Sequence, residues 1–134
     1  MKNGMNCPCK SGKQYEGCCK PFHIGQKPDT ALQLMRSRFS AYALCLPQYI
    51  MDTTHRANSQ FDKDAIRWAK NISEFSSHTE FSGLDILEFK EMGTKATVTF
   101  VAHLIQNKKD ASFTEKSYFE KESDKWLYVR GEFF

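Results

Sequence analysis

The stretch that decides the fold is residues 95–106, with the sequence Lys-Ala-Thr-Val-Thr-Phe-Val-Ala-His-Leu-Ile-Gln. Successive side chains of a β-strand point to opposite faces, so this stretch divides into two sets. One face carries Ala96, Val98, Phe100, Ala102 and Leu104, and the other carries Thr97, Thr99, Val101, His103 and Ile105. Such alternation predicts a strand of an antiparallel sheet that packs its apolar face on a core.

The residues on either side of this strand predict the rest of the fold. Three further strands are expected over residues 81–90, 111–122 and 126–133. Before them, apolar residues at helical spacing predict a long amphipathic helix over 30–46, a short helix over 47–51 and a third helix over 62–75. Helices followed by a strongly bent antiparallel sheet indicate an α+β fold.

Four of the five cysteines lie close together near the N-terminus, in the pattern C-x-C-x8-C-C: Cys7, Cys9, Cys18 and Cys19. Tetrahedral zinc takes four thiolates at about 2.3 Å, and four thiolates also suit iron. The surrounding segment is too short for a hydrophobic core, so metal binding would supply most of its folding free energy. We therefore predict one structural metal ion, preferably zinc, with a redox dithiol as the alternative. The fifth cysteine, Cys45, is expected to be a small core residue.

Composition and charge divide the chain into two domains, 1–28 and 29–134. Residues 1–28 hold five Lys and one Glu, whereas the remainder is nearly neutral. A basic segment of this kind suits an acidic partner, although lysines also serve solubility. No run approaches the roughly 18 apolar residues of a membrane span, and the first residues lack the apolar region of a secretory signal. We therefore expect a cytoplasmic protein with reduced thiols.

The cysteine segment resembles the SEC-C motif, which occurs at the C-terminal tail of the preprotein-translocase ATPase SecA and at the ends of many other bacterial proteins. The four cysteines occupy its ligand positions, and Ser11, Gly12 and Tyr15 also match. Lys10 stands where the motif commonly has Gly. The resemblance implies a zinc knuckle that docks a protein or the ribosome. A closed set of four thiolates leaves no position for a reacting water, which argues against catalysis there.

Beyond the knuckle, the chain resembles the YchJ-like family, in which a SEC-C knuckle precedes a nuclear-transport-factor-2-like domain, also called cystatin-like. The resemblance rests on residues 34–42 (Leu-Met-Arg-Ser-Arg-Phe-Ser-Ala-Tyr), 53–55 (Thr-Thr-His), 115–119 (Glu-Lys-Ser-Tyr-Phe) and 126–131 (Trp-Leu-Tyr-Val-Arg-Gly). Thr54 replaces a Trp of the family pattern. The resemblance implies a cone, with helices packed in a curved sheet. That fold also resembles ketosteroid isomerases, scytalone dehydratase and polyketide cyclases, which use a pocket in the cone.

Eight side chains are candidates for such a pocket: Arg36, Arg38, Tyr42, Asp52, His55, His103, Glu115 and Arg130. Four of them carry the pocket hypothesis: Arg36, His55, His103 and Glu115. Arg36 suits either a structural ion pair with Glu115 or Asp52, or a clamp on a substrate. For His55 and His103, a hydrogen-bonded or solvated histidine is the alternative to acid–base chemistry. The alternation around Glu115 does not decide whether it faces the inside of the cone.

Two functional hypotheses follow. The first is a zinc-binding adaptor protein, without enzymatic activity, whose knuckle docks a macromolecular partner. The second is a small pocket enzyme or small-molecule binder that uses the cone. Nucleic acid is not expected as the primary partner, because the charge of residues 1–28 is small once the zinc thiolates are included. The exposed sheet face around Thr97, Thr99 and Val101 allows a homodimer without requiring one.

Overall fold

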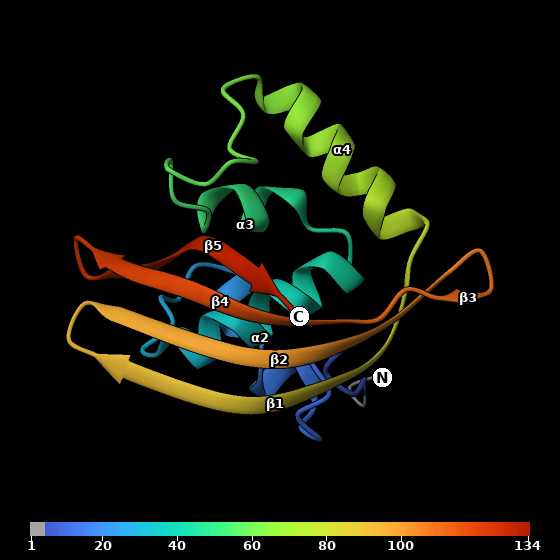
Figure 1. Ribbon diagram of the computed structural model, residues 1–134, viewed down its shortest axis with the longest axis horizontal. Helices are drawn as coiled ribbons and strands as arrows, with labels where there is room; N and C mark the ends of the chain where they lie inside the picture. The colour runs from blue at the N-terminus through green and yellow to red at the C-terminus, as the bar shows by residue number, and fades with distance from the viewer. Residues whose placement is uncertain (1–4) are drawn as a thin grey trace.

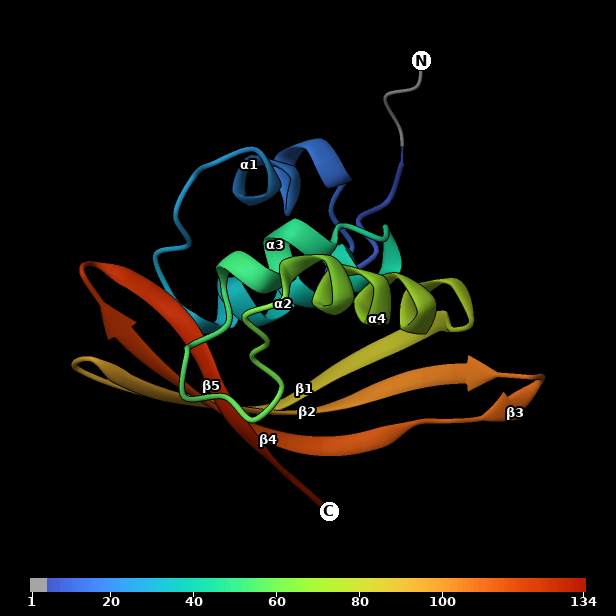
Figure 2. The same ribbon diagram turned by 90° about the horizontal axis from the view of Figure 1, so that it is seen from above.

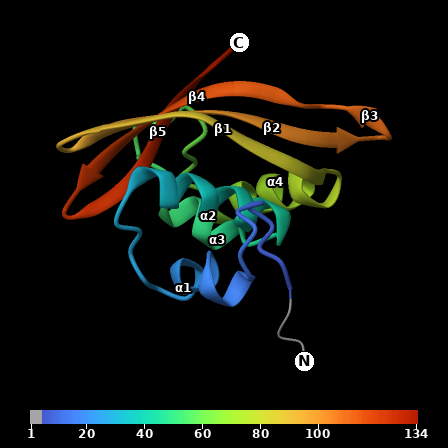
Figure 3. The same cartoon turned by 90° about the horizontal axis from the view of Figure 1, so that it is seen from below.

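The computed structural model describes residues 5–134; the first four positions of the predicted segment 1–28 lie outside the described residues. A curved antiparallel sheet holds the main helices against its concave face (Figures 1 and 2). The knuckle, residues 5–28, lies on the side of these helices that faces away from the sheet (Figure 3). The predicted α+β order is confirmed, and the molecule is built as sheet, helices and knuckle in three layers.

The sheet consists of β1 (Glu80–Met92), β2 (Lys95–Gln106), β3 (Lys109–Asp110), β4 (Phe113–Glu122) and β5 (Lys125–Phe133). Its order is β1-β2-β4-β5, and the short β3 pairs only with β2. The predicted strand 95–106 has the observed bounds of β2, and its apolar set is buried. The predicted strand 111–122 begins two residues late, at Phe113. Before it, Asn107 and Lys108 both take positive φ and form a tight two-residue turn between β2 and β3.

The helices are α2 (Ala31–Ala43), α3 (Pro47–Asp52) and α4 (Ala65–Ser77), with η1 (Tyr15–Gly17) and α1 (Lys20–His23) in the knuckle. Thr30 and Gln33 cap the start of α2 with a reciprocal pair of hydrogen bonds. The expected helix 30–46 ends early, because Cys45 adopts φ 58° and turns the chain into α3. Cys45 is exposed, so the prediction that it is a core residue is wrong.

Helix α2 is the centre of the molecule, since it is covered on two sides. Leu34, Met35 and Phe39 pack on the sheet together with Val98 and Trp126. On the side toward the knuckle, its serines 37 and 40 are also completely buried. The one-sided amphipathic helix expected from the apolar spacing is therefore a helix buried between two layers. Within residues 5–134, no helix is both long and apolar enough to cross a membrane.

Candidate functional site

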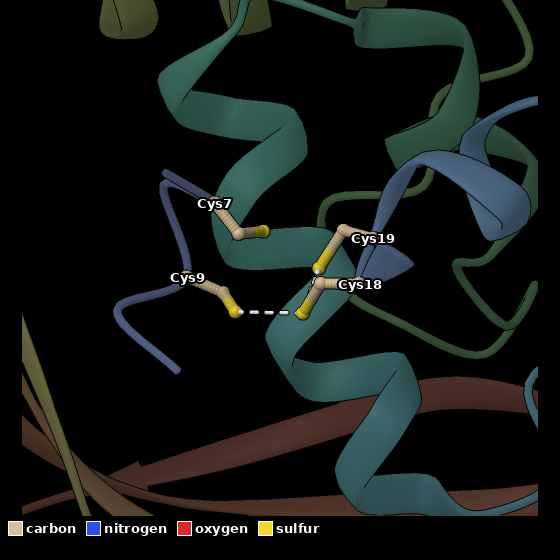
Figure 4. Close-up of side chains that lie close together, drawn as sticks. All are labelled: Cys7, Cys9, Cys18 and Cys19. Atoms are coloured by element: carbon tan, nitrogen blue, oxygen red, sulfur yellow. Dashed lines mark hydrogen bonds between the residues drawn. The ribbon is translucent and has the colours of Figure 1, made fainter. Parts of the chain in front are cut away.

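The four knuckle cysteines bring their sulfur atoms together, with all ligand atoms within 4.8 Å of one another (Figure 4). The Sγ atoms of Cys9 and Cys18 are 3.6 Å apart, and those of Cys18 and Cys19 are 4.0 Å apart. A tetrahedron with zinc–sulfur bonds of about 2.3 Å has edges of about 3.8 Å. All four cysteines are free thiols. The donor chemistry and the spacing therefore fit a four-thiolate metal ion.

Tight backbone turns place the two cysteine pairs. The amide of Lys10 donates to the carbonyl oxygen of Cys7 at 3.1 Å, and Lys10 takes φ 65° to close this turn. A left-handed position of this kind favours glycine, which explains why the SEC-C pattern commonly has Gly there. Cys18 follows η1 and Cys19 caps α1, so the second pair is carried by the junction of two helical turns. The two pairs thus face each other across one small loop.

Polar groups surround the thiols. The hydroxyl of Ser11 lies 3.2 Å from Cys18 Sγ, and Arg36 Nη1 donates to the carbonyl oxygen of Cys9 at 3.0 Å. The same Nη1 lies 3.8 Å from Cys9 Sγ. Contacts with the thiols of Cys19 and Cys7 lower the pKa of Cys9 far below its ordinary value. Arg36 supplies a cation beside the negative charge that four thiolates would create.

His23 fastens the knuckle to α2. Its Nε2 donates to the carbonyl oxygen of Ser37 at 2.8 Å, and its Nδ1 accepts from the Tyr15 hydroxyl at 2.7 Å. Its ring also packs edge-on against Tyr49, with centroids 4.8 Å apart. Burial lowers the pKa of His23, which keeps the ring neutral in this arrangement. The knuckle thus packs on the second domain, and no periodicity of the sequence indicates this role of His23.

A second site lies inside the cone. A cavity of about 610 Å³ opens between α2, α4 and the concave face of the sheet. Its walls are mostly aromatic, formed by Phe39, Phe75, Phe81, Phe100, Phe113 and Phe119. Small-molecule sites typically have volumes of about 300–1,000 Å³ and apolar walls with few polar groups. The volume and the apolar walls of this cavity are therefore those of a small-molecule site.

Two buried charges line this cavity: Arg38 and Glu115, which are 8% and 6% exposed. Arg38 Nη1 donates to Ile50 O, Thr53 Oγ1 and Thr54 Oγ1 at 3.1, 2.8 and 3.1 Å. Glu115 Oε2 accepts from Ser117 Oγ at 2.6 Å and from the Tyr128 hydroxyl at 2.8 Å. The guanidinium also lies over the Tyr128 ring, 4.7 Å from its centroid. Tyr128 therefore touches both charges.

Gly131 makes room for this arrangement. A Cβ atom at residue 131 would overlap Glu115 Oε2, lie 2.5 Å from its Cδ and lie 2.8 Å from the Tyr128 hydroxyl. Residue 131 is opposite Ser117 in the pairing of β5 with β4. The glycine is thus required by the close approach of the buried carboxylate to the backbone. It closes the stretch 126–131 that supported the family resemblance.

The structure separates the four predicted pocket residues, and only Glu115 lines the cavity. Arg36 forms neither the expected ion pair nor a clamp, because it turns toward the knuckle. His55 Nε2 donates to Glu122 Oε2 at 2.6 Å, in the loop beside β5. His103 lies on the opposite sheet face and donates to Asp85 Oδ2 at 2.7 Å. The second cavity charge is Arg38, two positions after Arg36, where helical periodicity turns the side chain to another face.

His55 also forms a close group with Glu120 and Glu122, whose ligand atoms lie within 4.8 Å of one another. The backbone amide of Ala57 donates to His55 Nδ1 at 2.9 Å. A neutral imidazole that accepts at Nδ1 carries its proton on Nε2, the atom that faces Glu122. This nitrogen donates a hydrogen bond and has no lone pair for a metal. His55 and Glu122 are therefore joined by a hydrogen bond, and the group carries no metal site in this arrangement.

The geometry defines a class of protein: a cone-shaped α+β domain with a ligand-sized cavity and a four-cysteine SEC-C knuckle seated on its central helix. Residues 30–131 match the family described as "YchJ, middle NTF2-like domain". The chain belongs to this YchJ-like family, as its sequence resemblance predicted. It is 36% identical to a UPF0225 protein from Haemophilus influenzae over 126 residues, which cover 92% of this chain and 75% of that relative.

Two solved structures share both the knuckle motif and the fold. A SEC-C motif containing protein from Rhodopseudomonas palustris has a TM-score of 0.79 and 32% identity, covering 96% of this chain and 98% of the other. A second one, from Psychrobacter arcticus, has a TM-score of 0.76 and 28% identity, covering 92% and 80% of the two chains. The predicted fold class is confirmed.

Proposed function

We propose that this protein binds a small molecule in the cone cavity, and that the knuckle is a structural metal site. The supporting observation is that Arg38 and Glu115 are buried in the cavity wall with part of their hydrogen-bonding capacity unused. Among residues 5–134, Nε and Nη2 of Arg38 and Oε1 of Glu115 have no hydrogen-bond partner and are not fully buried, and both residues line the cavity. Burying a charge is costly unless its polar atoms are satisfied, so a ligand that satisfies them binds favourably.

Binding, rather than catalysis, is the function we propose for the cavity. Among the described residues, no histidine, cysteine or lysine contributes to its lining. The Tyr128 hydroxyl is not a ready acid, since burial and the neighbouring Glu115 carboxylate raise its pKa above the ordinary value. The remaining polar groups suit recognition of a ligand, with the aromatic walls excluding water from it.

Zinc is the metal that we propose for the knuckle. The four thiolates form a closed set, which is the arrangement of structural zinc sites. Elemental analysis of the purified protein is expected to give one zinc per chain. One iron per chain, with the visible absorption of iron–thiolate bonds, would contradict the proposal.

Binding of a neutral apolar dye tests the cavity. N-phenyl-1-naphthylamine is expected to fluoresce more strongly when it enters the cone. Ala102 lines the cavity from β2, and its neighbour Val101 points to the other sheet face. Ala102→Phe should therefore weaken dye binding at least tenfold, while the matched variant Val101→Phe should leave it unchanged. Equal dye binding by both variants would contradict a ligand-binding cavity.

Docking of a macromolecular partner through the knuckle is a second candidate function. The observation that favours it is an exposed basic surface on the side away from the sheet, with Lys10, Lys13 and Lys20 around the knuckle and Ile24, which is 75% exposed. Co-sedimentation with purified ribosomes tests one such partner. Reversing the charges of Lys10 and Lys13 to Glu should abolish sedimentation, whereas the same change at Lys63 and Lys70, near or on α4, should not. Identical sedimentation of the two double variants would contradict docking by the knuckle.

A further inference from the structure

We propose that the ligand of the cone is a small monocarboxylate with an aromatic or apolar body and one hydroxyl or amino donor. This inference rests on the proposed ligand-binding function and deepens it. It follows from three features of the cavity: the free edge of Arg38, the free oxygen of Glu115 and the aromatic walls.

Arg38 has the geometry of a carboxylate clamp. Its Nη1 is held by three oxygen atoms, from Ile50, Thr53 and Thr54, at the end of α3. Its guanidinium plane is further positioned over the Tyr128 ring. Within residues 5–134, the edge formed by Nε and Nη2 has no hydrogen-bond partner. This edge presents two parallel N–H groups, the fork that binds a carboxylate through two hydrogen bonds. Because the guanidinium is already fixed, little conformational entropy is lost when the anion binds.

Glu115 provides an acceptor for a second ligand group. Its Oε2 already accepts from Ser117 and Tyr128, and Gly131 closes off the backbone side of the carboxylate. The raised pKa of Tyr128 keeps that hydroxyl a donor to Oε2. Among the described residues, Oε1 has no donor of its own, so it remains as a free acceptor on a residue that lines the cavity. A hydroxyl or amino group of the ligand would satisfy it.

The single cation of the cavity limits the ligand to one carboxylate. Arg38 is the single cation and Glu115 the single anion among the charged side chains that line the described cavity. A monocarboxylate pairs with Arg38 and leaves one unbalanced negative charge, that of Glu115, which accepts hydrogen bonds from Ser117 and Tyr128. A dianion such as a phosphate monoester would place its second charge near Glu115 with no further cation to balance it. In a cavity of low polarity, that arrangement is strongly disfavoured.

The aromatic walls of the cavity favour a ligand whose body is aromatic or apolar. Phe81 packs edge-on against Phe39 and Phe75, with ring centroids 5.5 and 6.0 Å apart. Phe100 and Phe113 are arranged in the same way at 6.2 Å. Rings in such arrangements accept a further aromatic ring by edge-to-face contact. A polyhydroxylated body would leave most of its hydroxyl groups unpaired against these walls.

Displacement of N-phenyl-1-naphthylamine by four matched compounds tests the proposal on the unmodified protein. 3-Phenylpropanoate carries the carboxylate alone. 2-Hydroxy-3-phenylpropanoate and 3-(4-hydroxyphenyl)propanoate add a hydroxyl at two different distances from it, and 3-phenylpropan-1-ol replaces the carboxylate by a neutral group. We expect 3-phenylpropanoate to compete at least tenfold better than the alcohol. At least one of the hydroxylated acids should compete a further fivefold better.

Two variants assign these differences to residues. Glu115→Gln should remove the advantage of the hydroxylated acid and leave the affinity of 3-phenylpropanoate within twofold. Arg38→Lys keeps a positive charge but removes the fork, so it should weaken all three acids at least fivefold and spare the alcohol. Thermal unfolding establishes that each variant is folded. If a variant does not fold, the comparison of the four compounds on the unmodified protein still decides the question.

The outcomes separate this inference from the proposed function. If the dye binds the cavity but the alcohol competes as well as the acids, the carboxylate ligand is refuted and ligand binding stands. If neither hydroxylated acid exceeds 3-phenylpropanoate, the donor group is refuted. If Ala102→Phe does not affect dye binding, the proposed function itself fails.

Discussion

Replacing Gly131 by alanine should break the hydrogen bonds from Ser117 and Tyr128 to the Glu115 carboxylate in the cavity wall. The new Cβ would occupy the space of the Glu115 carboxylate, so the carboxylate must move away from Ser117 and Tyr128. Hydrogen bonds to a charged group are worth about 1.5–3 kcal/mol each. Water in the cavity replaces part of the free energy of the two lost hydrogen bonds, so we expect a loss of about 3 kcal/mol in the free energy of unfolding. For a chain of this size, that corresponds to a fall of roughly 9–15 °C in Tm.

Thermal unfolding of four variants and the unmodified protein tests this reasoning. Gly17→Ala is the control, since a Cβ there meets no atom within 4 Å, and its Tm should stay within about 2 °C of the unmodified protein. Glu115→Ala removes the group that the new methyl displaces. The double variant should therefore be little less stable than Glu115→Ala alone, because both changes remove the same hydrogen bonds. Additive losses in the double variant, or an unchanged Tm for Gly131→Ala, would refute the explanation.

Three further predictions concern the knuckle and the loop beside β5. Removing the metal with a chelator, or introducing Cys18→Ser, should increase amide exchange of residues 5–28 while dye binding in the cone persists. Loss of dye binding together with increased amide exchange would show that the cone depends on the knuckle. Arg36→Ala should lower zinc affinity about 10–100-fold in competition with a chromophoric chelator, whereas Arg67→Ala on α4 should have no effect. The hydrogen bond from His55, followed by that from Arg56, holds the pKa of Glu122 below its ordinary value of 4.5. The stability that this carboxylate contributes is therefore complete above about pH 4.5, and it is lost as the pH falls through the lower pKa of the folded protein. In urea unfolding, the difference between Glu122→Gln and the unmodified protein should accordingly be complete at about pH 6 and shrink progressively as the pH falls below 4.5; a constant difference would contradict this assignment.

Much of the fold was predictable because it depends on periodicity. The alternation in residues 95–106 specified a buried face, and the bounds of β2 agree with it. The end of α2 was not predictable, since Cys45 takes a left-handed conformation that favours glycine or asparagine. The short strand β3 was also missed, because two residues carry no period.

The candidate functional residues were also only partly predictable from the sequence. The cysteine spacing is local, so the grouping of the four thiols could be predicted from the sequence alone. The cavity residues come from distant parts of the chain, and their roles depend on which face each side chain points to. Arg36 and Arg38 are only two positions apart, yet one contacts Cys9 and the other lines the cavity. That distinction requires knowledge of the layers on both sides of α2.

The surface between the knuckle and α2 is partly polar. Its contacts include hydrogen bonds from His23 to the carbonyl oxygen of Ser37 and from Arg36 to the carbonyl oxygen of Cys9, beside the edge-on packing of His23 against Tyr49. Water can replace such contacts, whereas it cannot replace the packing of Leu34 or Phe39 on the sheet. Contact surfaces of this kind between parts of one chain resemble those of transient complexes. The part of α2 that the knuckle covers therefore carries polar groups, including Ser37 and Ser40, besides its apolar face toward the sheet.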